Sequence, residues 1–403
     1  MDFEVVIIGS DVNAYYMARN CYEAYHKKAY VIGKIPMAFT SLSNILNITY
    51  NENLHDGEIL KKELKKIYDE HKGKKLLLIP CNDDYVRLVM ENQDYLKKYY
   101  YFHTISEELL NNLLIKDRFY TAYPSLDIPQ TYVYDFNDKL DMEKINELHY
   151  PLILKPGNGI LYHKHEFLSQ AKVYKIKTRD ELLSIIEKIK DSGYLGKIII
   201  QRFIPGDDSL LFDCVVYCDK HGKVKLMSFA QIGLQEHTKT GIGNCTLLVN
   251  GYNEFGHTKE ITKRLKDFIE SINYHGTAEF DLKYDIVDEK FRVLEINPRQ
   301  ARSSYYLTAL GYNLVEYLVD DLIYDKKLDY HFLDEKMVLS FVPKYVIKKY
   351  VKNEGLKKEI FKLIKEKKFC DPLYAKYDNS LRRRKWLFLR KINYIKKYKN
   401  CKW

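Results

Sequence analysis

The chain of 403 residues has neither a long apolar run nor a cysteine framework. No uninterrupted apolar stretch approaches the roughly 20 residues that a helix needs to span a bilayer, and an acidic pair, Asp2 and Glu4, stands at the start. The seven cysteines are odd in number and irregularly spaced, and Cys214 and Cys218 have no second Cys or His pair at zinc-site spacing. We expect a soluble, cytoplasmic protein with reduced thiols and no zinc.

The chain also lacks internal repeats and the G-x-G-x-x-G sequence of dinucleotide-binding proteins. It has instead an alternation of apolar β-type runs at 3–9, 29–33 and 75–80 with helical patterns at 13–26 and 57–71. This alternation predicts a parallel α/β domain of Rossmann type, and the missing glycines argue against a dinucleotide ligand. The length predicts two or three domains.

Acidic residues are missing from the end of the chain. The formal net charge is +10, and residues 381–403 hold ten Lys or Arg and no Asp or Glu, so the excess lies in this tail. We therefore expect no specific nucleic-acid partner. Apolar residues alternate with the basic ones in a helical pattern, which suits a peripheral position on an anionic membrane surface and suits equally a helix packed on the body. These apolar residues are Trp386, Leu387, Phe388, Leu389, Ile392 and Ile395.

Polar residues follow two of the N-terminal strands. Asp11 and Asn13 come after the first strand, and Asp83 comes after the third. Ligands of open α/β sheets bind beyond the carboxyl ends of the strands, so these three residues are candidates for substrate binding. Alternatively, Asp11 and Asp83 only cap the helices that follow them.

The strongest functional signal lies in a predicted hairpin. Two β-type runs, at 277–284 and 291–296, flank a short acidic turn. Because side chains alternate along a strand, Asp281, Glu295 and Asn297 can point to one face. Two carboxylates and an amide suit magnesium that completes its shell with water and substrate phosphates.

Two basic residues complete this chemistry. Arg299 follows the hairpin, where a transferring phosphoryl group needs positive charge. An apolar strand in residues 151–159, PLILKPGNG, delivers Lys155 into a glycine-containing turn, where its ammonium would neutralise nucleotide phosphates. Taken alone, the hairpin could also be a structural one with an inward-facing glutamate.

An Asp or Glu on one strand followed by E-I-N-P-R on the next resembles the metal-binding signature of the ATP-grasp superfamily. Three longer segments look like its carboxylate-amine ligase branch, which includes the D-aspartate ligases: GSDVNAYYMARNCYEAYHKKAYVIGK, LIPCNDDYVRLV and LEINPRQARSSYYLTALGYNLVEYLV. The resemblance covers nearly the whole chain and implies an α/β (α+β) ATP-grasp fold. It implies a Rossmann-like pre-ATP-grasp domain at 1–105, linker helices and a central lobe at 106–205, a C-terminal lobe with the metal site at 206–330, and a basic extension at 331–403.

The resemblance also implies ATP and two magnesium ions, for which Mn²⁺ can substitute. Lys116, in I-K-D-R-F-Y, and Lys155 would contact the nucleotide phosphates. The loop at 158–172 departs from the glycine-rich form of the family, which makes Lys172 a further candidate. A solvated helix lysine is the alternative for Lys116.

An apolar strand at 197–204 breaks at P-G-D-D, and in the resembled fold this segment is the hinge that binds adenine. The hinge would contact the nucleotide through Gln201, Arg202, Phe203 and Ile204, with Asp208 on the ribose.

A polar, glycine-containing loop at 235–244 could close on substrate. Lys239 and Asn244 are its candidates for substrate binding, while His237 is explained as well by a surface position. In the ligase reaction that the resemblance implies, Arg299 would stabilise the oxyanion that forms when the amine substrate attacks. Arg302 would bind the carboxylate of the acid substrate.

The implied reaction joins a carboxylate to an amine through an acyl phosphate and releases ADP and phosphate. In the resembled branch the acid is D-aspartate, and the amine is the lysine of a nucleotide-linked muramyl peptide in peptidoglycan synthesis. The alternatives are an ATP-grasp ligase of another pathway, and a non-catalytic ATP-binding protein whose tail binds membrane or nucleic acid. The second is disfavoured because the set of Lys155, Asp281, Glu295, Asn297 and Arg299 is complete.

Overall fold

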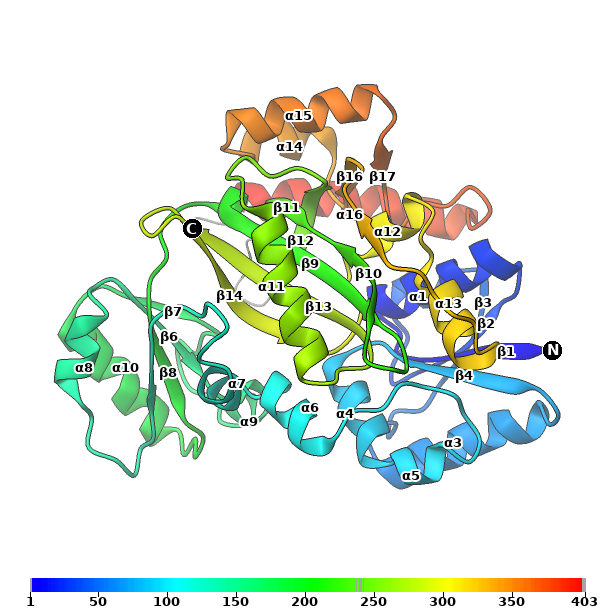
Figure 1. The fold of residues 1–403 in the computed structure, drawn as a ribbon, viewed down its shortest axis with the longest axis horizontal. Coiled ribbons are helices and arrows are strands. Elements are labelled where there is room, and N and C mark those ends of the chain that lie inside the picture. Colours follow the sequence, from blue (N-terminus) through cyan, green and yellow to red (C-terminus); the bar gives the residue numbers. More distant parts are fainter. Residues whose placement is uncertain (1, 237, 239–240, 242, 401–403) are drawn as a thin grey trace.

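The described residues form three β-sheets surrounded by helices. Figure 1 shows the computed structural model, which describes residues 2–236, 238, 241 and 243–400. A small sheet lies at the left of Figure 1, a nine-stranded sheet at the centre, and the N-terminal sheet at the right. Two helices, α6 (Glu107–Leu114) and α7 (Lys116–Ala122), run between the N-terminal sheet and the small sheet.

The N-terminal sheet is parallel, with strand order β3-β2-β1-β4. Strands β1 (Phe3–Ile8), β2 (Ala29–Gly33) and β4 (Lys75–Pro80) confirm the prediction, since their apolar runs are buried in the sheet. The edge strand β3 (Leu46–Tyr50) was not predicted, because only Leu46 of its residues is buried. The helices of this part are α1 (Val12–Tyr25), α2 (Ala38–Ser41), α3 (Gly57–Glu70), α4 (Asp83–Glu91) and α5 (Gln93–Leu96).

The small sheet is antiparallel, with strand order β5-β8-β6-β7. Its central strand β8 is the apolar run predicted at 197–204, and three consecutive isoleucines of it are fully buried. Helix α10 packs Leu182, Ile186 and Ile189 into the same apolar cluster. The elements are β5 (Thr131–Tyr134), α8 (Met142–Glu147), β6 (Leu152–Pro156), α9 (Gly159–His163), β7 (Tyr174–Ile176), α10 (Arg179–Asp191) and β8 (Ile198–Arg202).

The nine-stranded sheet carries the predicted hairpin, now β13 (Gly276–Asp285) and β14 (Lys290–Asn297). Its main path is β14-β13-β9-β11-β12-β16-β17, with β10 and β15 beside it. Strands β10 and β11 are separated at Phe229, yet both pair with β9 in one register from Leu226 to Gln231, after a β-bulge between Val224 and Leu226. The other strands are β9 (Leu211–Cys218), β10 (Val224–Ser228), β11 (Ala230–Gln235), β12 (Cys245–Asn250), β15 (His331–Leu333), β16 (Met337–Ser340) and β17 (Phe369–Cys370).

Short helices surround this sheet. Helix α13 (Leu314–Leu318) continues as the π-helical turn η2 (Val319–Ile323). The remaining helices are η1 (Asp208–Leu210), α11 (Thr258–Ser271), α12 (Tyr305–Ala309), α14 (Lys344–Tyr350), α15 (Glu354–Lys365) and α16 (Leu381–Asn400).

The chain after residue 330 joins the large sheet, since β16 pairs with β12 and β17 pairs with β16. The basic helix α16 lies against the body with Arg383, Tyr394 and Tyr398 buried, so the tail packs on the protein. Phe388 and Leu389 of the same helix stay exposed, so membrane binding stays a prediction. No helix among the described residues combines the length and apolarity that crossing a membrane requires. The domain limits at 105, 205 and 330 stay a prediction.

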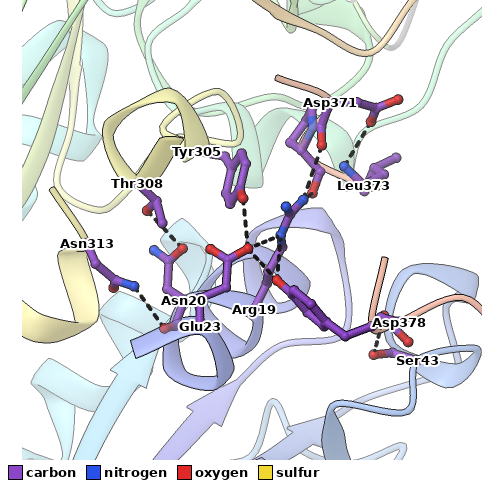
Figure 2. Close-up of polar contacts among 12 residues, drawn as sticks. Arg19, Asn20, Glu23, Ser43, Tyr305, Thr308, Asn313, Asp371, Leu373 and Asp378 are labelled. Atoms are coloured by element: carbon purple, nitrogen blue, oxygen red, sulfur yellow. Dashed lines mark hydrogen bonds and ion pairs between the residues drawn. The ribbon is translucent and has the colours of Figure 1, made fainter. Parts of the chain in front are cut away.

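Helix α1 is tied to the C-terminal segments, as Figure 2 shows. The Nη1 atom of Arg19 donates to the carbonyl oxygens of Asp371 at 3.1 Å and Pro372 at 3.0 Å. The carboxylate of Glu23 accepts from Nε of Arg19 at 2.9 Å and from the hydroxyl of Tyr305 at 2.9 Å. These contacts hold the N-terminal sheet in place against the sheet that carries the hairpin.

Candidate active site

A cavity of about 520 Å³ lies where the N-terminal sheet, the linker helices and the hairpin meet. Its walls bring together many of the residues that the sequence singled out. Those residues are Asp11, Asn13, Asp83, Lys116, Lys172, Asn244, Asp281, Glu295, Asn297, Arg299 and Arg302. Lys239 and His237 lie outside the described residues.

The strand register sets the face that carries the predicted metal ligands. Asp281 on β13 pairs with Glu295 on β14, and Glu279 pairs with Asn297. Directly opposed residues point the same way, and so do residues two apart, so all four side chains share one face. The geometry agrees with the predicted alternation, and the role of these residues as metal ligands stays a prediction.

Two further carboxylates stand at this face. Glu279 lies two residues before Asp281, and Asp213 on β9 pairs with Asp281 from the other side. Burial and the charge of Asp213 raise the pKa of Asp281 to about 6 and the pKa of Glu279 well above its usual value. Oδ2 of Asp213 accepts from the Ser303 hydroxyl at 2.7 Å. The sequence leaves open whether Glu279 shares the metal site, since it lies two residues before Asp281, whereas Asp213 reaches the group only through long-range strand pairing.

Crowded buried carboxylates fit a divalent cation, because its charge would relieve their mutual repulsion. No three Asp, Glu, His or Cys side chains of the described chain are arranged to hold a metal by themselves. Nδ2 of Asn297 donates to Asp281 at 3.1 Å, and its Oδ1 accepts from Arg299 at 3.3 Å. The amide would therefore rotate to offer its oxygen to a cation. The donor set suits magnesium that also takes phosphate and water ligands.

Lys116 connects the linker helices to the hairpin. Its Nζ forms an ion pair with Oε2 of Glu295, and its backbone N–H donates to the carbonyl of Gly157 at 2.9 Å. Burial, and next the charge of Lys172, lower the pKa of Lys116 to about 8. A Cβ at residue 157 would come within 2.6 Å of Oδ1 of Asp117, so this close approach requires glycine.

Lys155 is not among the residues that line the cavity, although Lys116 and Lys172, which line it, are close enough to affect its pKa. Its Nζ donates to the hydroxyl of Tyr120 at 2.7 Å and stands 4.7 Å from the centre of that ring. Burial lowers the pKa of Lys155 well below its usual value, and the charges of Lys116 and Lys172 act in the same direction. Three lysines thus form one electropositive group, which is suited to phosphate oxygens.

The residues of the predicted adenine hinge have other partners in this structure, and the described cavity walls do not include them. Arg202 pairs with Asp285 and Asp288, and Gln201 donates to the Thr131 hydroxyl at 2.8 Å. The carbonyl of Ile204 accepts from Lys283, Lys175 lies 3.9 Å from the centre of the Phe203 ring, and Asp208 accepts from the backbone and side chain of Gln235. Their contacts with a nucleotide stay a prediction.

The residues after the N-terminal strands have structural contacts as well as cavity positions. Asp11 caps α1 by accepting from the backbone N–H of Asn13 at 3.0 Å. Asn82, and not Asp83, caps α4, so the capping alternative was wrong for Asp83. Asn13 donates to the carbonyl of Cys81 at 3.1 Å. Asp11 therefore both caps helix α1 and lines the cavity. Asp83 does not cap its helix and instead contacts Arg299.

The two arginines after the hairpin differ in their contacts. Nε of Arg299 lies 2.7 Å from Oδ1 of Asp83, and its Nη1 lies 3.6 Å from Oε2 of Glu279. Arg302 lies over the Phe341 ring at 5.1 Å, and its buried Nε has no hydrogen-bond partner among the described residues. Arg299 is thus held firmly by acidic groups, whereas Arg302 has donors left for a ligand.

Solved structures with a similar arrangement of elements identify the fold of this protein. The N5-carboxyaminoimidazole synthetase of Staphylococcus aureus, complexed with ADP, is 14% identical, with a TM-score of 0.62 over 84% of this chain and 82% of that chain. An L-amino acid ligase from Bacillus licheniformis is 15% identical, with a TM-score of 0.57 over 82% of this chain and 75% of that chain. The fold is therefore that of an ATP-grasp protein with a pre-ATP-grasp domain.

Comparison with curated sequences identifies the family of this protein. No protein-family model matches the chain. A D-aspartate ligase of Enterococcus faecium (strain Aus0004) is 30% identical over 412 residues, which cover 99% of this chain and 96% of that protein. The chain belongs to the family of this D-aspartate ligase, within the ATP-grasp carboxylate-amine ligases, and is a ligase that forms carbon–nitrogen bonds.

Proposed function

We propose that the protein uses ATP to join the carboxylate of D-aspartate to an amine. The observation that carries this proposal is that Asp281, Glu295 and Asn297 line the same cavity as Lys116 and Arg299. The full-length similarity to a D-aspartate ligase supports the choice of acid. The choice of ATP is supported by the ADP complex of the S. aureus synthetase and by a MgADP complex of the Hydrogenobacter thermophilus 2-oxoglutarate carboxylase domain, whose TM-score is 0.60.

The proposed reaction has two steps. First, a carboxylate oxygen of the acid attacks the γ-phosphorus of ATP, the bond to the bridging oxygen breaks, and ADP leaves. Second, the amine nitrogen attacks the carbonyl carbon of the acyl phosphate, the carbon–oxygen bond to phosphate breaks, and the nitrogen loses a proton. No covalent bond to the protein is needed, so the chain acts by positioning and by charge.

In this proposal, basic residues bind the phosphates and the hairpin residues bind magnesium. Lys116, Lys155 and Lys172 would neutralise the phosphates, which otherwise repel the incoming carboxylate. Magnesium, as two ions with Mn²⁺ as a substitute, would be held by Asp281, Glu295 and Asn297 and would supply further positive charge. The predicted contacts of Gln201, Arg202, Phe203, Ile204 and Asp208 with the nucleoside belong to the same proposal, as do those of Lys239 and Asn244 with substrate.

Arg299 is proposed to stabilise the oxyanion that forms when the amine attacks. Its guanidinium is held by Asp83 and Glu279, so it is already oriented before substrate binds. Arg302 would bind the acid through its unused donors. Asp11, Asn13 and Asp83, which line the cavity, would contact the amine substrate, such as the lysine of a nucleotide-linked muramyl peptide.

The test is a screen of amino acids and cell-wall precursors for release of ADP and phosphate. Hydroxylamine in place of the amine should trap the activated acid as a hydroxamate, with one ADP released per product. AMP and pyrophosphate as the product pair would overturn the mechanism. Turnover with another acid but not with D-aspartate would overturn only the choice of substrate.

A further inference from the structure

The last turns of helix α16 reach the strands that border the cavity. The hydroxyl of Tyr398 donates to the carbonyl of Gln235, at the end of β11, at 2.6 Å. The same hydroxyl shares a 2.6 Å hydrogen bond with Thr246, near the start of β12. One residue earlier on α16, Nζ of Lys397 forms an ion pair with Oε1 of Glu236. The C-terminal helix therefore contacts both strands next to Asn244 and Cys245, which line the cavity.

Glu236 is fixed where it stands. Only 8% of its surface is exposed, and its backbone N–H donates to the carbonyl of Asn244 at 2.8 Å. Its Oε1 also accepts from the Thr238 hydroxyl at 3.2 Å. A Cβ at residue 241 would lie 2.7 Å from the same oxygen, so the carboxylate and the chain at Gly241 are in close contact. A buried carboxylate in this setting requires a positive partner.

Among the described residues, Lys397 and Arg302 are the cations that act on this carboxylate. Burial acts to raise the pKa of Glu236, but the hydrogen bond from Lys397 and the charges of Lys397 and Arg302 outweigh it and leave this pKa below its usual value. Lys397 makes the ion pair, whereas Arg302 lines the cavity and its buried Nε has no hydrogen-bond partner in the described part of the chain. The strand contacts place Arg302 nearby: it lies over the ring of Phe341, whose backbone N–H donates to the carbonyl of Thr246 at 2.9 Å, two residues after the Asn244 that Glu236 contacts. Glu236 thus forms an ion pair with Lys397 and has Arg302 as a second cation in its surroundings.

We propose that Lys397 is a positioning residue that holds Glu236 away from Arg302, so that Arg302 stays available to the anionic group of the substrate. Without Lys397, the buried carboxylate would pair with Arg302, the other described cation that acts on it, and that pairing would occupy the guanidinium. The C-terminal helix would then act on acid binding without touching the substrate. The part of this inference that concerns substrate rests on the proposed function, while the pairing itself does not.

The pairing can be tested without turnover by labelling the full-length protein with an arginine-selective dicarbonyl reagent and measuring modification of Arg302 by peptide mass spectrometry. In Lys397→Gln, labelling of Arg302 should fall several-fold, because a paired guanidinium is shielded. In Lys397→Gln/Glu236→Gln it should return to the parent level, and Lys397→Arg should leave it unchanged. Lys396→Gln and Lys399→Gln, on the exposed side of the same helix, are the matched controls.

Steady-state kinetics then test the consequence. With D-aspartate as the acid, Lys397→Gln should raise the KM for the acid by about tenfold, the effect of losing one charged hydrogen bond. The KM for ATP should stay unchanged, and the added Glu236→Gln change should restore the KM for the acid. If Arg302 labelling is unchanged and Lys397→Gln lowers only the Tm, Lys397 merely fastens the helix and the inference is wrong. Absence of turnover in the parent protein would instead overturn the proposed function.

Discussion

Arg299 and Asp83 join the two halves of the candidate site through a 2.7 Å contact between Nε and Oδ1. Asp83 begins helix α4 of the N-terminal part, and Arg299 follows the hairpin of the large sheet. The same guanidinium also contacts Glu279 and Asn297. Its position therefore depends on the docking of the N-terminal sheet as much as on the hairpin itself.

We expect turnover to depend strongly on Arg299, because it contacts both halves of the site. Arg299→Ala should lower kcat by roughly 10² to 10³, the range measured when one donor to an oxyanion is removed. Arg299→Lys should recover only part, since lysine keeps the charge and loses the planar fork that contacts Asp83 and Asn297. The measurement is ADP release at saturating substrates. Arg179→Ala, exposed at the start of α10, should leave kcat unchanged.

Magnesium dependence tests the hairpin carboxylates. Asp281→Asn and Glu295→Gln preserve shape and remove charge, so each should raise the magnesium concentration needed for half-maximal turnover by tenfold or more. The readout is ADP release as a function of magnesium at fixed ATP. Glu289→Gln, exposed in the turn of the same hairpin, is the matched control. Unchanged magnesium curves for both site variants would mean that the metal is bound elsewhere.

Nucleotide affinity should depend on pH through Lys116. Because the pKa of Lys116 in the folded protein is about 8, this ammonium loses its proton as the pH rises through that value. The charge that binds phosphate is present below the pKa and lost above it, so the Kd for ATP should increase from pH 7 to pH 9. Lys116→Arg keeps its charge over this range and should flatten the profile. An equally steep rise in this variant would exclude Lys116 as the source.

Stability should depend on the buried pair between Arg383 and Asp378. Nε of Arg383 lies 3.1 Å from Oδ2 of Asp378, and neither side chain is exposed. Arg383→Ala leaves the carboxylate buried and unpaired, which should lower the free energy of unfolding by about 3–5 kcal/mol. Urea unfolding measures this loss. The exposed neighbour offers a control, since Arg384→Ala should change stability by no more than about 0.5 kcal/mol.

Binding to an anionic membrane stays a prediction of the sequence. Helix α16 keeps Phe388 65% and Leu389 51% exposed among basic residues, which is the surface such binding would use. Cosedimentation with anionic liposomes should then fall in Phe388→Ser/Leu389→Ser. Equal sedimentation of the parent and this variant, or sedimentation with neutral liposomes as well, would remove the membrane interpretation.

The local pattern of the sequence was enough to predict some elements in detail. The apolar runs of β1, β2, β4 and the hairpin follow the buried faces of their strands, and a period of two places Asp281, Glu295 and Asn297 together. The edge strand β3 has too few buried residues to be seen in this way. The spacing of apolar residues shows which side of a helix or strand is buried, but it does not show which other element packs on that side.

The tertiary structure alone decided the partners of these elements. Asp213 joins Glu279 and Asp281 because β9 pairs with β13, and Lys116 meets Glu295 because the linker helices dock on the hairpin. Helix α16 is amphipathic by sequence, yet only its packing shows that its end reaches Glu236. Contacts between residues far apart in the chain depend on strand order and register, which no local pattern contains.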